Sequence, residues 1–151
     1  SPLERARETA APIAEARRLP VQVEPGLDEC DFGRWTGARL RRLARTPEWR
    51  VVQRHPSGFR FPGGESFVEM QARITSALGR LVTAHPGQTV VAVSHADPIK
   101  AAVAHALGTH LDLFQRIVIS PASVTVIAYR PDGPVVLMVN STAGELDGMA
   151  W

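Results

Sequence analysis

Residues 89–98 (TVVAVSHADP) combine a histidine with a turn of the kind that binds anions. Residues 90–93 are continuously apolar, which is typical of a strand buried on both faces. Asp97 is a suitable N-cap and Pro98 a suitable first helical residue, so a helix is predicted to follow at once. His95 is therefore expected at the carboxyl end of a buried strand, beside a helix N-terminus.

That position favours a bound phosphate group. Ligands of open α/β sheets bind at the carboxyl ends of the strands, and a helix start offers unpaired N–H donors and a positive dipole end. We therefore expect His95 and Ala96 to contribute to phosphate binding. A histidine at a strand end is also often a packing or capping group, and this segment alone does not decide between the two roles.

Two segments nearer the start of the chain carry residue types that suit phosphoryl chemistry. Arg5 lies in the first turns of a predicted helix, where its planar guanidinium can bind phosphate through two parallel hydrogen bonds. Residues 27–37 place three acids around Phe32 and Trp35. A carboxylate held against apolar rings has a raised pKa and can serve as a general acid. The alternatives are a solvated helix arginine and a turn with solvated acids.

Residues 46–64 carry three prolines and several glycines, and they are predicted to form a long surface loop or lid. Arg54, His55 and Arg60 in this loop would suit a substrate with a second negative group, although a solvated loop explains them equally well. Glu65 and Ser66 follow. Ser66 is a predicted helix cap, and Glu65 either orients a group of the site or supports that cap.

The composition is that of an ordinary globular chain. It has 151 residues, 44% hydrophobic and 21% charged, which suits one compact domain over residues 1–151. The single cysteine excludes an internal disulfide and favours a reducing, cytoplasmic location. The net charge is only +2, and the sequence contains no nucleic-acid motif, so nucleic-acid binding is not indicated. No apolar run reaches membrane-spanning length, and the spacing of the histidines does not resemble a metal site.

Helical and strand patterns alternate along the chain, which predicts an α/β fold with an antiparallel strand pair at the C-terminal end. The predicted elements are a helix to about residue 19, a strand at 21–23, a loop at 25–37, a short helix at 38–45, a helix at 66–81, a strand at 90–94, a helix at 98–107, a short helix or turn at 111–116, and strands at 123–129 and 135–139.

Four motifs occur in order: Ser-Pro-Leu-x-Arg-Ala-x-x-Thr-Ala, Leu-x-Glu-x-x-Phe-Gly-x-Trp-x-Gly, Gly-Gly-Glu-Ser, and Ser-His at the predicted strand end. As a set they resemble the histidine phosphatase superfamily, which includes the cofactor-dependent phosphoglycerate mutases. They are most similar to its small bacterial phosphomutase and phosphatase branch. The resemblance implies a three-layer sandwich with a mostly parallel sheet flanked by helices.

The resemblance also implies roles for individual residues. Arg5 matches a phosphate-binding arginine, Glu29 the carboxylate that protonates the leaving oxygen, and His95 the histidine that hydrogen-bonds the transferring phosphoryl group. Glu65 and Ser66 match the family's Gly-Glu-Ser helix start. No metal ion or other cofactor is implied, because arginines and histidines neutralise the phosphoryl charge.

The family's nucleophile, the histidine of an Arg-His-Gly motif after a first strand, is not found in this sequence. Residues 54–56 read Arg-His-Pro, but Pro56 lacks the backbone N–H that an oxyanion needs there. We therefore interpret the chain as an N-terminally truncated domain. The absence of the family's central strand would leave ladder groups unpaired, so the isolated chain is expected to be marginally stable or dependent on a partner.

The sequence thus predicts a parent enzyme that hydrolyses or transfers phosphoryl groups through a phosphohistidine, acting on a small phosphorylated substrate, with this chain alone inactive. The alternative is a non-catalytic domain that binds a phosphorylated ligand or serves as a scaffold. Neither the substrate nor the choice between mutase and phosphatase is readable from the sequence. A homodimer remains an open option for the assembly.

Overall fold

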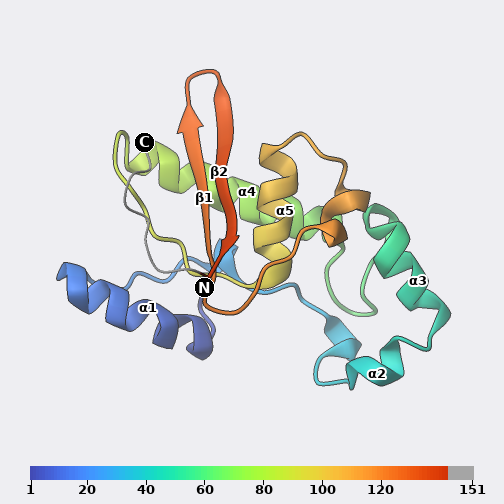
Figure 1. Cartoon of the computed structure of the whole chain (residues 1–151). Coiled ribbons are helices and arrows are strands. Elements are labelled where there is room, and N and C mark those ends of the chain that lie inside the picture. Colours follow the sequence, from blue (N-terminus) through green and yellow to red (C-terminus); the bar gives the residue numbers. More distant parts are fainter. Residues whose placement is uncertain (143–151) are drawn as a thin grey trace.

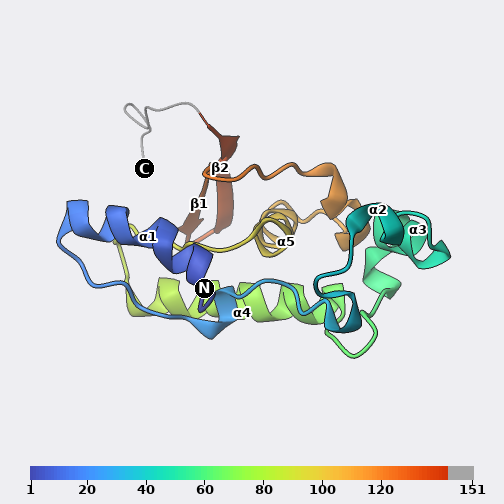
Figure 2. The ribbon, with the colours of Figure 1, turned by 90° about the horizontal axis from the view of Figure 1, so that it is seen from below.

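Two helices, α4 (Phe67–Ala84) and α5 (Ala96–Ala106), form the centre of this computed structural model, which describes residues 1–142 (Figure 1). Figure 2 shows α5 end-on, between α4 and the β1–β2 sheet. The other elements are α1 (Glu4–Arg17), α2 (Leu40–Leu43), α3 (Pro47–Arg54), β1 (Val124–Arg130), β2 (Gly133–Ser141) and the 3₁₀ turns η1 (Pro25–Leu27), η2 (Gly33–Trp35), η3 (Pro56–Gly58) and η4 (Leu111–Arg116).

Aromatic side chains hold the loop after η1 against these helices. The rings of Phe32 and Phe61 meet edge to face with centroids 5.0 Å apart, and Phe61 contacts Phe67 at 5.1 Å. Phe67 is fully buried and meets Phe114 of η4 at 5.0 Å. Such pairs add about 0.5–1.5 kcal/mol each beyond their buried area. The segment that carries Glu29 is therefore attached to the core through a continuous row of rings.

The start of α4 is as predicted. Ser66 accepts a hydrogen bond from the backbone N–H of Glu69, and the Glu69 carboxylate accepts one from the N–H of Ser66. This reciprocal capping box satisfies two donors that the first turn leaves unpaired. The short helical turn at 111–116 and the hairpin of β1 and β2 are likewise confirmed.

Two predicted strands are wrong. Residues 21–23 and 90–94 have no strand structure, and Val90 and Val91 are 42% and 63% exposed rather than buried on both faces. An apolar run becomes a strand only where a neighbouring strand accepts its ladder bonds, and residues 1–142 place none beside it. The only sheet they form is the antiparallel β1–β2 pair, so they do not make a mostly parallel sheet.

The predicted loop over residues 46–64 is also wrong, because it contains α3 and η3. Pro47 occupies the first turn of α3, where a missing N–H costs nothing, so this proline starts a helix instead of preventing one. Val52 is 3% exposed and Trp49 packs on the core. Trp49 and Val52 are three residues apart, which is the spacing of one face of a helix. The prolines and glycines of this segment obscured that pattern in the sequence.

The start of α5 differs by two residues from the prediction. His95 itself is the N-cap, and Pro98 is the third helical residue, still within the turn whose N–H groups lack helical partners. Asp97 does not cap the helix. Its carboxylate binds the ammonium group of Lys100 at 3.0 Å instead. Within residues 1–142 no helix is both long enough and apolar enough to span a bilayer.

Candidate active site

Three residues far apart in the sequence meet at the N-terminus of α5. Oε2 of Glu29 lies 3.9 Å from Nη2 of Arg5 and 3.9 Å from Nδ1 of His95. Arg5 comes from the first turns of α1, Glu29 from the segment between η1 and η2, and His95 from the N-cap of α5. A cation, a carboxyl group and an imidazole thus converge around one point.

His95 is buried and largely neutral. Nε2 of its ring lies 2.8 Å from the hydroxyl of Ser1, whose proton is directed to Asp28 at 3.2 Å. The hydroxyl of Ser1 has a single proton, which it donates to Asp28, so its oxygen must accept the hydrogen bond from His95. Nε2 is therefore the nitrogen that carries the proton. Burial and, next, the guanidinium of Arg5 lower the pKa of His95. At neutral pH the ring is therefore a hydrogen-bond donor without a full charge.

Glu29 has the opposite shift. Burial raises the pKa of its carboxyl group, only partly offset by the hydrogen bond that Oε1 accepts from the N–H of Cys30 at 2.9 Å. The carboxylate of Asp97 raises this pKa further, and Arg5 lowers it. A carboxyl group that keeps its proton to higher pH is suited to general-acid catalysis.

The first turn of α5 adds backbone donors. The N–H groups of Ala96 and Asp97 have no acceptor within the helix, and Pro98 has no N–H. They lie at the positive end of the dipole of an 11-residue helix. Together with the ring of His95, they make this end of α5 suitable for a phosphate group.

Sequence reasoning missed Arg73 of α4, which holds the Glu29 segment in place. Its guanidinium donates to the backbone carbonyls of Gly26, Asp28 and Glu29 at 3.0–3.1 Å. It also binds both carboxylate oxygens of Glu65. Arg73 lies two turns along α4, eight residues after Glu65, a spacing that in retrospect was the available signal.

Glu65 completes this connection. Its Oε1 accepts a hydrogen bond from the N–H of Asp31 at 3.0 Å and also binds Arg73. The Glu65 side chain thus connects Arg73 to the segment that follows Glu29. Glu65 therefore orients a part of the site, one of the two roles predicted for it. Ser66 has the capping role described above.

We expect Arg73→Met to destabilise the protein by about 2–4 kcal/mol, because it leaves three carbonyls without this donor and the mostly buried carboxylate of Glu65 without its cation. Arg80→Met is the matched control on the same helix. Arg80 makes one exposed ion pair with Glu24, so its loss should cost under about 1 kcal/mol. Urea unfolding measures both, and equal losses would contradict the assigned role of Arg73.

The residues predicted to bind substrate from the 46–64 segment have partners of their own. Nδ1 of His55 lies 2.9 Å from Asp112, and Arg60 pairs with Glu69. Arg54 ends α3 and is exposed. None of the three makes a contact with Glu29 or His95 among the hydrogen bonds and ion pairs of residues 1–142. Their role in substrate binding stays a prediction.

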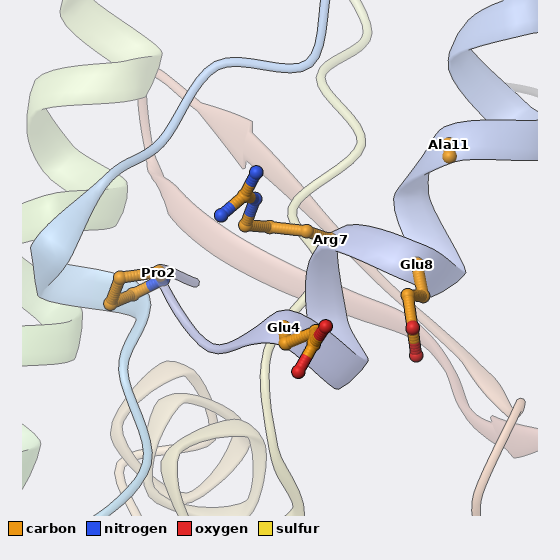
Figure 3. Close-up of a pocket in the computed structure, with 5 residues that line it drawn as sticks. All are labelled: Pro2, Glu4, Arg7, Glu8 and Ala11. Carbon is orange, nitrogen blue, oxygen red and sulfur yellow. The ribbon is translucent and has the colours of Figure 1, made fainter.

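Two surface hollows are lined by residues of α1 and of the first turn of α5. One lies along α1 and is lined by Pro2, Glu4, Arg7, Glu8 and Ala11 (Figure 3). The carboxylates of Glu4 and Glu8 extend to the same side of the helix there, which disfavours a phosphate group. The other, of about 430 Å³, reaches Asp97 in the first turn of α5. No cluster of potential metal ligands is found within residues 1–142.

The chain is similar to known proteins in sequence and in fold. The family model of the histidine phosphatase superfamily (branch 1) matches residues 1–142. The chain is 35% identical over 144 residues to phosphoserine phosphatase 1 of Hydrogenobacter thermophilus, covering 94% of this chain and 68% of that protein. It is 35% identical, again over 94% of its length, to a bifunctional protein of Mycobacterium tuberculosis.

Among solved structures, the chain is similar to mycobacterial glucosyl-3-phosphoglycerate phosphatase in complex with inorganic phosphate. The TM-score is 0.82 at 26% identity, over 93% of this chain and 74% of that one. The chain therefore belongs to the histidine phosphatase superfamily and has its α/β fold. It spans 40% of the length of the mycobacterial bifunctional protein.

Proposed function

We propose that this chain carries the acid and most of the phosphate-binding groups of a phosphatase or phosphomutase that works through a phosphohistidine. The observation that carries this proposal is the convergence of Arg5, Glu29 and His95 within 3.9 Å contacts at a helix N-terminus. The family membership and the relatives named as phosphatases support it.

Each group has a role in the proposed reaction. Arg5, the Nε2–H of His95 and the N–H of Ala96 bind the oxygens of the phosphoryl group, His95 exchanging the hydroxyl of Ser1 for a phosphoryl oxygen. A histidine nitrogen attacks phosphorus while the bond to the leaving oxygen breaks, and Glu29 gives its proton to that oxygen. Water then attacks the phosphohistidine, the Glu29 carboxylate takes its proton, and phosphate is released.

We propose that residues outside this sequence supply the attacking histidine. The 151 residues contain no Arg-His-Gly, and His55, the one histidine preceded by arginine, is bound to Asp112 instead. Exposed Val90 and Val91 support an additional strand at the same place, since it would cover them and satisfy their backbone groups. The resulting unit would be one domain with the three-layer, mostly parallel architecture of the family.

A small phosphorylated compound is the proposed substrate. The relatives named as phosphoserine phosphatase and glucosyl-3-phosphoglycerate phosphatase support this class of substrate. A non-catalytic phosphate-binding domain is the second candidate, and the lack of Arg-His-Gly favours it. A reading frame that encodes this motif upstream of Ser1 would support the enzyme, and one without it the binding domain.

The test uses the protein expressed from its complete coding sequence, assayed with p-nitrophenyl phosphate in EDTA. We expect hydrolysis that chelation does not reduce, and a phosphoenzyme that is stable in alkali and labile in acid, as a phosphoramidate bond is. Binding of inorganic phosphate without any turnover would instead support the second candidate.

A further inference from the structure

The hollow of about 430 Å³ reaches Asp97 in the first turn of α5, the helix whose N-cap is His95. Two of its wall residues continue the segments of the site: Phe32 follows Glu29 by three residues, and Asp97 follows His95 by two. The charge of Asp97 acts directly on the pKa of Glu29. A substrate whose phosphoryl group lies at Arg5 and His95 can thus extend its leaving group into this space.

The walls are mainly apolar and aromatic. The lining residues include Trp35 of η2, Leu40 and Leu43 of α2, Trp49 and Val52 of α3, and Phe61. Trp35 meets Phe59 and Phe61 with centroids 5.5 Å away in each case, so the indole is fixed in the wall. A volume of this size lies in the range of small-molecule sites, which is roughly 300–1,000 Å³.

The charged groups of the hollow neutralise each other. Asp97 and Lys100 are the only charged residues among those that line it. The ammonium group of Lys100 binds the carboxylate of Asp97 at 3.0 Å and the amide oxygen of Gln115 at 3.3 Å, and it lies over the ring of Phe114. A carboxylate or second phosphate on the leaving group would therefore find no unpaired cation here. The arginines of residues 54–60 are not part of these walls.

We propose that the substrate is a phosphomonoester whose leaving group carries an uncharged apolar or aromatic ring, and not a small acid such as phosphoserine or phosphoglycerate. This inference rests on the proposed function. Enclosing an unpaired carboxylate in an apolar site is strongly unfavourable, whereas packing a ring against apolar and aromatic side chains is favourable.

The test compares benzyl phosphate with 4-carboxybenzyl phosphate on the protein expressed from its complete coding sequence. Both esters release a benzylic oxygen, so the carboxylate is the main difference between them. We expect kcat/KM to be at least about tenfold higher for benzyl phosphate, and higher than for phosphoserine. Equal or reversed values would overturn the proposal.

Two variants locate the effect. Trp49→Ala should lower the ratio of kcat/KM for benzyl phosphate to kcat/KM for methyl phosphate, which has no ring, about tenfold or more. Trp49→Phe should retain most of this ratio. Leu43→Lys adds a cation to the wall, and it should shift the preference toward 4-carboxybenzyl phosphate by about tenfold. Unchanged preference in Leu43→Lys would contradict the assignment of this hollow. If no ester is hydrolysed at all, including p-nitrophenyl phosphate, the proposed function itself fails.

Discussion

Replacing His95 with alanine in the protein expressed from its complete coding sequence should lower kcat for phosphomonoester hydrolysis about 10²- to 10³-fold. In the proposed reaction His95 is a buried donor to the phosphoryl oxygens, and the loss of one such donor has a cost of this order. Steady-state kinetics with p-nitrophenyl phosphate measure the effect.

His105→Ala is the matched control, because His105 is an exposed histidine in the last turn of the same helix. It should retain nearly full activity, and both variants should show the same secondary structure by circular dichroism. Equal activity of the two folded variants would contradict the role of His95.

Glu29→Gln should lower kcat for benzyl phosphate about 10²- to 10⁴-fold, because glutamine cannot protonate the leaving oxygen. The loss should be far smaller for p-nitrophenyl phosphate, whose phenolate leaves without a proton. This difference between the two esters distinguishes a general acid from a residue that only maintains the fold. Glu8→Gln on the exposed face of α1 serves as the control and should be unaffected.

The dependence of activity on pH provides a second test of Glu29. Burial raises the pKa of Glu29 above its ordinary value, so the protonated acid persists to higher pH than in a solvated carboxyl group. Activity that needs this proton should be full below that pKa and fall as pH rises through it. In Glu29→Gln this fall in activity at higher pH should disappear. If the fall persists in the variant, it is caused by the titration of another residue.

The chemistry-bearing residues could be predicted because their signals are local. A histidine before a helix start, an arginine in a first turn and a carboxylate among aromatic residues each stand out in a short window of sequence. Their ordered combination then indicated the family, and the structure brings Arg5, Glu29 and His95 together. The capping box at Ser66 was readable for the same reason.

The errors came where structure depends on distant partners or on position within a turn. Residues 90–93 have the composition of a buried strand, but composition does not supply the neighbour with which a strand must pair. Pro47 is typical of a loop in the local sequence, but in the structure it starts α3. Arg73 was missed because three of its acceptors are carbonyls more than forty residues earlier in the chain. Only its eight-residue spacing from Glu65 was a signal in the local sequence.

In the reaction that we propose, this chain supplies the acid and the phosphate-binding groups, and the attacking histidine lies outside it. The most direct measurement is hydrolysis of p-nitrophenyl phosphate in EDTA by the purified 151-residue chain, with His95→Ala beside it and circular dichroism on both. Our account predicts that the folded chain shows no turnover above the His95→Ala background. Turnover that His95→Ala abolishes would contradict it, because one of the chain's own histidines would then be the nucleophile.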